Sequence, residues 1–406
     1  MENTTMHTPR LSLHLSAHAL VACLAVILGV PASVVAQCGG EWGVQTESIV
    51  AFDQIDAPTT VDPDGAGPIP AKHYAGGIGA GGIGAGPFGG VAGWSDGQTG
   101  WQTLGTGING RVRALVSNSD IVYAGGTFTT ANGVSTPNVA KWAGQWVPLD
   151  TGLPGTMITD GVRALAIGPN QQVFAGGRFN NLGVFAKWNG QVWENLGSGF
   201  NGPVQALTMH NGELIAGGLF TSADGSAAVN SARWDGSAWQ PIGGLVPGEV
   251  RALTSFRGEL FVGGIDDGVA SLAAWNGQTS RTFPNGPRGS IYALNVFKND
   301  LIAAGAFTVP GVVGARDIAR WSGVDGELWR SMRAGIEGGV YALWPTATDL
   351  VVGGALTAAN GQVTKRWARW RTEIASPTVT PTNATLLCGR FQYATLVTIA
   401  TGPGPI

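Results

Sequence analysis

A unit of roughly 46 residues recurs seven times, and this repeat constrains the fold more than any other feature of the chain. Its third copy is the clearest and consists of four short β-prone pieces at 162–165, 173–177, 185–188 and 193–197. Turns with Asn-Gly or Asp-Gly follow the third piece in several units, which is typical of hairpins. Four short strands per unit are typical of one propeller blade. The sequence therefore predicts an all-β fold, a seven-bladed β-propeller of four-stranded blades.

Three further positions recur with the unit. The opening piece is predicted at 49–52, 112–115, 162–165, 204–207, 250–253, 291–294 and 340–343. A glycine pair ends the second piece at 76–77, 125–126, 176–177, 217–218, 263–264 and 353–354, with Ala304-Gly305 in the sixth unit. A tryptophan lies in the third piece at 94, 142, 188, 234, 275, 321 and 370, and another begins the fourth piece at 101, 146, 193, 239 and 329. We expect the glycines to allow close backbone packing and the tryptophans to fill the wedges between blades.

Composition and periodicity together exclude low-complexity disorder, collagen, helical repeats and an open β-solenoid. The chain has 65 glycines and 22 prolines in 406 residues, fewer than in a low-complexity disordered chain, and no Gly-X-Y period runs through it. No 3.6-residue periodicity supports helical repeats, and an open β-solenoid has shorter coils. Only the glycine-rich stretch 75–93 departs from the repeat, and we expect it to form an extended loop between strands.

The repeat resembles that of kelch-type propellers, an architecture also used by galactose oxidase. The resemblance rests on Gly176-Gly177, Trp188 and Trp193, with equivalents in the other units, and covers about residues 42 to 374. One difference is consistent, because the tyrosine that the family carries in the third strand is tryptophan here. The resemblance implies a kelch-like propeller fold, and no activity is carried over with it.

Both ends of the repeat region are expected to meet. The seventh unit lacks a fourth piece, whereas Glu41-Trp42-Gly43-Val44 precedes the first unit. We expect this N-terminal segment to form the outer strand of the last blade and to close the ring. Cys38 and Cys388 would flank the same seam, and a disulfide between them is possible in an oxidising compartment.

The segments outside the repeats suggest export. Residues 1–36 read as a signal peptide with an apolar run from Ala19 to Val30, residues 37–374 as the propeller, and residues 375–406 as a Pro/Thr-rich linker and tail. Lipidation at Cys23 is the alternative. We expect a protein that is secreted or located in the cell envelope, monomeric, and without stable membrane insertion after signal cleavage.

Chemical motifs are sparse. The formal net charge is −3 with scattered charges, so no nucleic-acid partner is expected. Histidine and cysteine are too few for a transition-metal site, and no catalytic residues, metal or cofactor are predicted. The segment Ser95 to Trp101 is superficially similar to the Asp box of sialidases, but it coincides with an ordinary turn of the repeat. No carboxylate pair suits glycoside hydrolysis, and no P-loop lysine is present.

One repeat position carries variable polar residues. The second residue of the opening strand is Val50 in the first unit, and the remaining members are the ligand-binding candidates Arg113, Arg163, Gln205, Arg251, Tyr292 and Tyr341. If that strand lines the channel, the arginines and tyrosines could bind an anionic or sugar-like ligand by forked hydrogen bonds and stacking. Alternatively, these side chains only bond to neighbouring blades or to channel water. The loops at 127–136 and 220–226 are a second candidate surface.

Two functions remain open. The first is a non-catalytic secreted module that binds a protein or polysaccharide through one face of the ring. The alternative is an extracellular enzyme that acts on carbohydrate at the channel mouth. A deep pocket with paired carboxylates, or with histidine and tyrosine, would favour the enzyme.

Overall fold

A computed structural model describes residues 41–43, 52–62, 69–79, 90–95, 101–153, 161–179, 184–246, 248–265, 271–323, 328–364 and 366–371. These residues belong to one compact unit, Glu41–Thr372. The predicted signal peptide, the C-terminal tail, Cys38 and Cys388 lie outside the described residues. Within the described part of the chain, no helix has the length and apolar character needed to cross a membrane.

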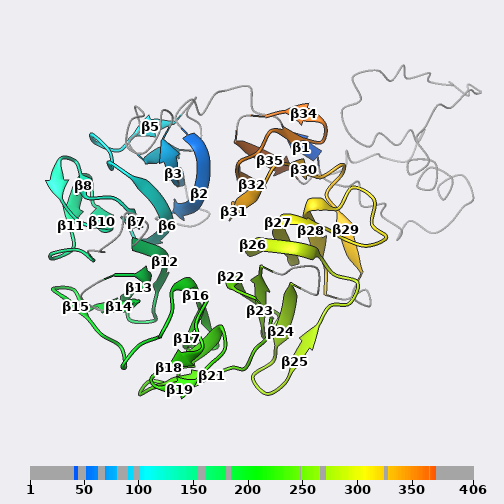
Figure 1. The fold of residues 1–406 in the computed structure, drawn as a ribbon. Helices are drawn as coiled ribbons and strands as arrows, with labels where there is room; N and C mark the ends of the chain where they lie inside the picture. The colour runs from blue at the N-terminus through cyan, green and yellow to red at the C-terminus, as the bar shows by residue number, and fades with distance from the viewer. Residues whose placement is uncertain are drawn as a thin grey trace, which may run out of the picture. The chain divides into compact units, whose positions relative to one another are not determined.

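The described strands form seven four-stranded antiparallel sheets around an open centre (Figure 1). Sheet 1 contains β2 (Phe52–Val61), β3 (Lys72–Gly79), β4 (Val91–Ser95) and β5 (Gln102–Thr103). Sheet 2 contains β6 (Arg111–Asn118), β7 (Ile121–Thr127), β10 (Val139–Trp142) and β11 (Trp146–Pro148). Sheet 3 contains β12 (Gly161–Ile167), β13 (Val173–Arg178), β14 (Phe185–Trp188) and β15 (Trp193–Glu194). Sheet 4 contains β16 (Val204–His210), β17 (Glu213–Gly218), β20 (Ser231–Trp234) and β21 (Trp239–Pro241).

The remaining sheets continue the same order. Sheet 5 contains β22 (Val250–Phe256), β23 (Glu259–Gly264), β24 (Leu272–Trp275) and β25 (Ser280–Thr282). Sheet 6 contains β26 (Arg288–Phe297), β27 (Asp300–Thr308), β28 (Arg316–Trp321) and β29 (Trp329–Ser331). Sheet 7 contains β31 (Val340–Pro345), β32 (Asp349–Gly354), β35 (Trp367–Arg371) and β1 (Glu41–Gly43). The first strand of each sheet lies nearest the centre, and β31 contacts β2 as other neighbouring first strands contact one another (Figure 1).

Short two- and three-stranded ribbons lie at one end of the sheets. They are β8 (Thr130–Ala131) with β9 (Val134–Ser135), β18 (Ser222–Ala223) with β19 (Ser226–Ala227), and β33 (Ala358–Ala359) with β34 (Gln362–Val363) and β30 (Ile336–Glu337). The first two ribbons lie in the predicted loop surfaces 127–136 and 220–226. The expectation that 75–93 is one long loop is wrong at both ends, since β3 extends to Gly79 and β4 begins at Val91.

Every first strand carries a β-bulge near its start, where one extra, unpaired residue lies between two residues that pair with consecutive residues of the second strand. The extra residues are Asp56, Arg113, Arg163, Gln205, Arg251, Tyr292 and Tyr341. The predicted opening piece 49–52 is therefore wrong, because Ile55, Asp56 and Ala57 occupy its place. The connection between β2 and β3 is longer than the equivalent connection in the other units, so the repeat spacing placed the predicted opening piece too early in the chain.

The two glycines of each pair serve different contacts. A Cβ built on Gly76 would lie 2.6 Å from Cγ1 of Val112 in the next sheet, so the first glycine makes room for a neighbouring side chain. A Cβ on the second glycine, Gly77, would collide with the carbonyl oxygen of Gln54 in its own sheet. The same relation joins sheets 7 and 1, where a Cβ on Gly353 would lie 2.7 Å from Cγ2 of Ile55.

Fourth-strand tryptophans connect neighbouring sheets. Nε1 of Trp146 donates a hydrogen bond to the carbonyl oxygen of Leu104 at 2.9 Å, and Trp193 and Trp239 make the equivalent bonds to Leu149 and Leu196. Trp42 in β1 does the same in sheet 7, donating to the carbonyl oxygen of Met332 at 2.8 Å. Trp42 thus takes the position of the fourth-strand tryptophan that the seventh unit lacks.

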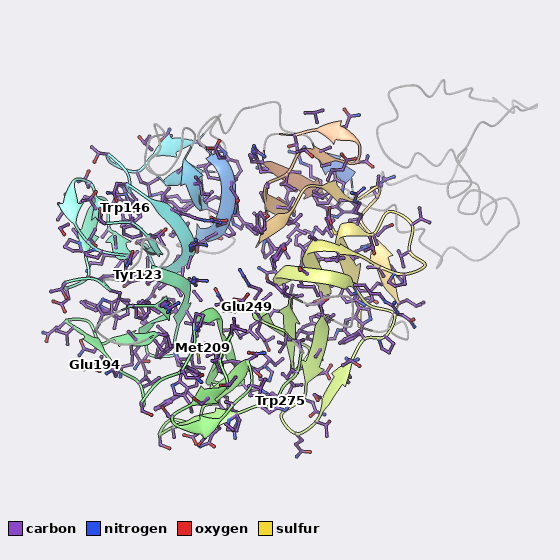
Figure 2. The ribbon with its side chains drawn as sticks, in the orientation of Figure 1. Tyr123, Trp146, Glu194, Met209, Glu249 and Trp275 are labelled. Atoms are coloured by element: carbon purple, nitrogen blue, oxygen red, sulfur yellow. The ribbon has the colours of Figure 1, made fainter. Side chains whose placement is uncertain are left out.

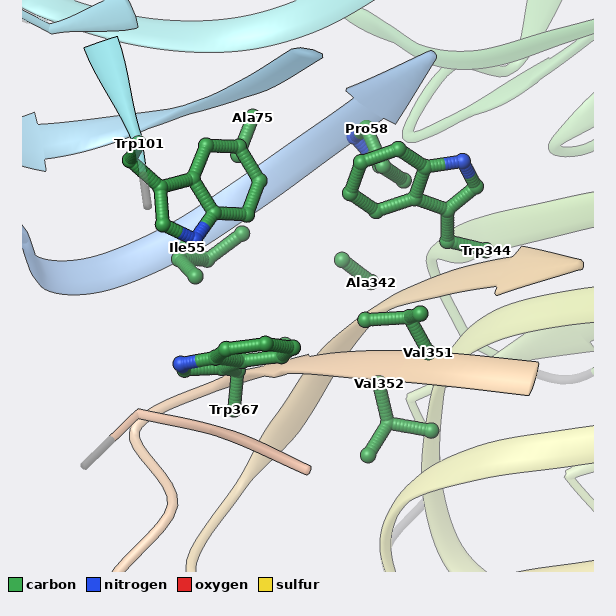
Figure 3. Close-up of a pocket in the computed structure, with 10 residues that line it drawn as sticks. Ile55, Pro58, Ala75, Trp101, Ala342, Trp344, Val351, Val352 and Trp367 are labelled. Atoms are coloured by element: carbon green, nitrogen blue, oxygen red, sulfur yellow. The ribbon is translucent and has the colours of Figure 1, made fainter. Parts of the chain in front are cut away.

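The contact between sheets 7 and 1 is rich in aromatic side chains. Trp344 and Trp367, which are outside the repeat pattern, lie beside Trp101 around a small apolar void of about 10 Å³ (Figure 3). Nε1 of Trp344 donates to Oγ1 of Thr60 across the two sheets at 2.5 Å. Indole rings therefore fill much of the contact between these two sheets.

Candidate functional site

A cavity of about 430 Å³ lies where the bulges face the centre of the ring. Its walls are formed by residues at the bulge position, by residues two positions earlier, and by one residue after a second strand. They are Gln54, Asp56, Arg111, Arg113, Arg163, Gln205, Arg251, Ile265, Tyr292 and Tyr341. We call this space the arginine cavity.

All six predicted ligand-binding candidates line the arginine cavity, namely Arg113, Arg163, Gln205, Arg251, Tyr292 and Tyr341. Val50 lies outside the described residues, and Asp56 holds the corresponding bulge position in sheet 1. A bulge turns one extra side chain out of the ladder, which explains why a single repeat position supplies the wall of the cavity.

The first polar network joins sheets 1 and 2. Arg111 binds Asp56 with both prongs of its guanidinium group, from Nε to Oδ2 at 2.6 Å and from Nη2 to Oδ1 at 2.7 Å. Gln54 donates from Nε2 to Oδ1 of Asp56 at 2.5 Å. The side chain of Asp56 is only 8% exposed, so the bidentate pairing compensates for the burial of its charge.

The second network runs through sheets 3, 4 and 5. Nη1 of Arg163 donates to Oε1 of Gln205 at 3.0 Å, and Nε2 of Gln205 donates to Oε1 of Glu249. Glu249 also pairs with Nη2 of Arg251 at 2.8 Å. Glu249 extends from the inner edge of the ring beside the central opening (Figure 2). This chain of contacts holds three neighbouring sheets in one arrangement.

Arg113 lies partly buried among the other arginines of the cavity. No described residue accepts a hydrogen bond from its buried Nε. Burial and the neighbouring guanidinium groups, Arg111 first, lower the pKa of Arg113 to about 10, although Asp56 acts in the opposite direction. Its cation is therefore held in a site that disfavours positive charge.

The two tyrosines form a separate part of the wall. Their ring centroids are 5.2 Å apart with a tilt of 38°. Burial, followed by Tyr292 and Asp56, raises the pKa of Tyr341. Tyr341 therefore offers a neutral hydroxyl group at neutral pH, and both rings offer aromatic surface to a ligand.

Charge in and around the cavity is unbalanced. Four arginines (Arg111, Arg113, Arg163 and Arg251) face two carboxylates, Asp56 and Glu249. The carboxylates are bound to Arg111 and Arg251, which leaves an excess of positive charge. Such a site can bind an anionic group, since forked guanidinium donors match the geometry of a carboxylate.

The arginine cavity lies at one end of the ring. The bulges are near the first residues of the first strands, and Ile265 directly follows the last residue of β23. Because neighbouring antiparallel strands run in opposite directions, the connections from second to third strands lie at the same end. This end also carries the ribbons β8–β9 and β18–β19, and we call it the ribbon face.

Sequence reasoning missed Gln54, Asp56, Arg111, Glu249 and Ile265. Gln54, Arg111 and Glu249 share one repeat position, two residues before the bulge, where the other units carry short or small residues. An alignment of units anchored on the Ile/Val-x-Ala pattern would have found this position once Ile55 was chosen instead of Ile49. Nothing in the sequence indicated Ile265.

Groups required for catalysis or metal binding are sparse. Among the residues that the structure describes, no cluster of three or more His, Cys, Asp or Glu side chains could hold a metal ion. The two carboxylates at the cavity are each bound to an arginine. Buried His73 and His210 lie in other parts of sheets 1 and 4.

Comparison with known proteins supports the fold alone. No protein-family model and no curated protein matches the chain. Among solved structures, the chain is similar to the WD40 β-propeller domain of Doa1, with a TM-score of 0.54, 15% identity, and coverage of 82% of this chain and 96% of that one. It is similar to YCF48 bound to D1 peptide, with a TM-score of 0.51, 16% identity, and coverage of 84% and 97%. The computationally designed Ika8 protein has a TM-score of 0.51, 18% identity, and coverage of 81% and 100%.

These neighbours share the repeated four-stranded antiparallel sheets described above, and similarity extends over most of each chain. The identities are too low to transfer a ligand or a partner. The chain has an all-β fold of the β-propeller type.

Proposed function

We propose that this protein is a non-catalytic binding module that captures an anionic group of a partner in the arginine cavity. Arg113 is the observation that carries the proposal, because its cation is buried among other cations and lacks a hydrogen-bond partner for Nε among the described residues. A bound carboxylate would supply that partner and offset the excess positive charge. The partner, a protein or a polysaccharide, would contact the ribbon face.

The ring geometry belongs to the same proposal. We propose a seven-bladed, kelch-like propeller closed by β1 in the last blade, which is supported by the pairing of Trp42 with Trp370 and by the contact of β31 with β2. A closed ring keeps the bulge residues of non-adjacent sheets at fixed separations. Preorganised arginines lose little conformational entropy on binding.

A partner of protein type has some support from the fold. YCF48, a structure of similar fold, is bound to a peptide. We propose that the present protein acts outside the cytoplasm as a secreted or envelope-located monomer, because residues 1–36 resemble a signal peptide.

The alternative, an enzyme of carbohydrate chemistry, requires a free acid or base near the channel. In the described residues the candidate carboxylates Asp56 and Glu249 are bound to arginines, so we favour binding over catalysis.

The test is a binding screen of the mature protein against immobilised surface proteins and anionic and neutral glycans. We expect retention that weakens as ionic strength rises, because the proposed attraction is electrostatic. Replacing Arg113, Arg163 and Arg251 together by alanine should reduce retention by about tenfold or more.

The matched control replaces three exposed cations on other surfaces, Lys72, Arg330 and Arg371, by alanine. Net charge changes equally in both triple variants, so only the loss of a specific site distinguishes them. Equal retention by the two variants would remove the arginine cavity as the binding site.

A further inference from the structure

In three sheets, an aromatic side chain at the end of the first strand covers the third-strand tryptophan of the next sheet. Five residues after the bulge, sheets 4, 5 and 6 carry His210, Phe256 and Phe297. His210 lies 6.2 Å from Trp275, and Phe256 lies 6.1 Å from Trp321, measured between ring centroids. Phe297 packs in the same core cluster as Trp370. These three tryptophans are only 9%, 4% and 2% exposed.

Sheet 3 has Gly168 at the same position. Gly168 therefore places no side chain against the corresponding tryptophan of the next sheet, Trp234, which is half-buried. A groove of about 320 Å³ opens between sheets 3 and 4, at the place where sheets 4, 5 and 6 each pack an aromatic ring against the next sheet. Gly168 thus leaves unfilled the space that an aromatic ring occupies in three of the other sheets.

The floor of the groove is apolar. Phe174 and Leu196 of sheet 3 and Met209, Leu214 and Trp234 of sheet 4 form it. Met209 projects from β16 on the lower side of the ring in Figure 2. Trp239 packs against Trp234, with ring centroids 5.6 Å apart. This contact fixes the orientation of the remaining surface of the Trp234 ring.

The rim of the groove is polar and carries both signs of charge. Gln172 and Lys187 provide donors, whereas Glu213 and Asp235 provide acceptors. Glu213 pairs with Arg233 at 2.6 Å, and Lys187 lies 3.6 Å from Glu194. Opposite charges therefore nearly cancel around the opening, which gives no preference for a charged ligand.

We propose that the groove between sheets 3 and 4 is a second binding site, which takes one ring of a neutral saccharide stacked on Trp234. A pyranose has an apolar face of C–H groups that can replace the missing aromatic ring on the indole, and an edge of hydroxyl groups that can bond to the rim. An aromatic side chain would cover the floor equally well but would leave the rim donors and acceptors unused. The site is at the turn between β12 and β13, the opposite end of the first strands from the bulges, so it is independent of the arginine cavity.

Titration calorimetry of the mature protein with neutral oligosaccharides of glucose, mannose, galactose and xylose tests the proposal. We expect saturable binding of at least one of them, unaffected by ionic strength. Gly168→Phe places a ring where sheets 5 and 6 have one and should weaken this binding about tenfold or more. The new Cβ would lie 2.7 Å from Cε2 of Phe174, so that ring must turn aside.

Two further variants keep the test independent of how Gly168→Phe folds. Gln172→Ala removes one rim group, and Trp234→Ala removes the floor, so both should weaken binding. Trp188→Ala alters the equivalent half-buried tryptophan of sheet 3 and should leave binding unchanged. Circular dichroism and melting curves check that each variant is folded.

Three outcomes would overturn the proposal. They are no saturable binding of any neutral oligosaccharide, binding that Gln172→Ala and Trp234→Ala leave unchanged, and preferential binding of N-acetylphenylalanine amide over every saccharide. Retention of anionic partners by the Gly168→Phe variant depends on the arginine cavity and does not test the groove.

Discussion

At the scale of single residues, a few buried polar side chains have protonation states that the fold constrains. His210 is 2% exposed and lies between two polar partners. Nδ2 of Asn211 is 3.1 Å from its Nε2, and Oγ of Ser255 is 3.0 Å from its Nδ1. Because an amide nitrogen only donates, Nε2 must accept, and the neutral imidazole carries its proton on Nδ1.

Stability should therefore fall in mildly acidic solution. Burial lowers the pKa of His210 below its ordinary value of 6.5, although Glu213 acts in the opposite direction. Below about pH 6.5 this histidine binds a proton in the unfolded chain but stays neutral in the folded protein. The free energy of unfolding therefore declines as pH falls below that value, and above it this histidine has no effect on the free energy of unfolding. The melting temperature of wild type should therefore fall relative to that of His210→Phe, which copies Phe256, as the pH is lowered through this range. Parallel curves for the two proteins would contradict this assignment.

Asp317 is a second constrained group. It has φ of 60° and accepts a hydrogen bond from the backbone N–H of Phe307, as Asn138 and Asn230 do for Phe128 and Phe220. Both asparagines also donate from Nδ2 to a backbone carbonyl, which an ionised aspartate cannot do. Burial raises the pKa of Asp317.

Replacing this carboxylate should stabilise the protein. We expect Asp317→Asn to raise the free energy of unfolding by about 1 kcal/mol at neutral pH, because it removes a poorly solvated charge and restores a donor. The gain should shrink as pH falls and the aspartate is protonated. Urea unfolding at neutral and acid pH measures it, and a destabilised variant at neutral pH would refute the argument.

At the scale of elements, six of the seven second strands carry a glycine pair, and the two glycines face different neighbouring atoms. A Cβ on Gly176 would lie 2.5 Å from Cγ1 of Val204, which is a side chain of the next sheet. A Cβ on Gly177 would collide with the carbonyl oxygen of Gly161, which is backbone of the same sheet. The bulge on the first strand brings that carbonyl close, so the bulge and the second glycine require each other.

The two glycines should therefore respond differently to alanine. Gly176→Ala is expected to cost roughly 1–3 kcal/mol by overpacking, and most of this loss should be recovered when Val204→Ala is added. Gly177→Ala should lower the free energy of unfolding further. Val204→Ala should not rescue this loss, because the new Cβ collides with a backbone carbonyl that no side-chain substitution removes. Chemical denaturation of the three single variants and two double variants measures both effects. Equal rescue of both glycine variants would show that the bulge does not limit the second position.

At the scale of the whole molecule, the last sheet is completed by the three residues of β1. Trp42 is 7% exposed, donates to the carbonyl of Met332 and meets Trp370 edge to face with ring centroids 5.1 Å apart. The other sheets obtain this tryptophan from their own fourth strands, whereas sheet 7 obtains it from the opposite end of the described chain.

Removing this contact should destabilise the entire ring. We expect Trp42→Ala to lower the free energy of unfolding by about 3–5 kcal/mol, and deletion of residues 38–46 to lower the melting temperature at least as much. Trp42→Phe keeps most of the apolar surface and should cost less. A melting curve of Trp42→Ala that coincides with that of wild type would mean that β1 does not contribute to stability.

Local patterns determined much of this protein from its sequence. Alternating apolar residues, turn glycines and recurring tryptophans predicted all-β blades of four strands, because strand and turn propensities act over a few residues. The six ligand-binding candidates line one cavity because one repeat position is always the bulge, and their binding of a ligand stays a prediction. The assignment of the first unit failed where a longer hairpin broke the spacing, and so Asp56 was missed.

Only the tertiary structure decided which charges meet and where space remains. Arg111 finds Asp56, and Gln205 finds Glu249, across sheet boundaries that no local pattern encodes. Gly168 appears in the sequence as one glycine among 65, and it opens a groove only because Trp234 of the following sheet lies opposite it. Sequence periodicity specifies each sheet, whereas pairing and cavities depend on how two sheets pack together, which is set by side-chain volumes at positions far apart in the chain.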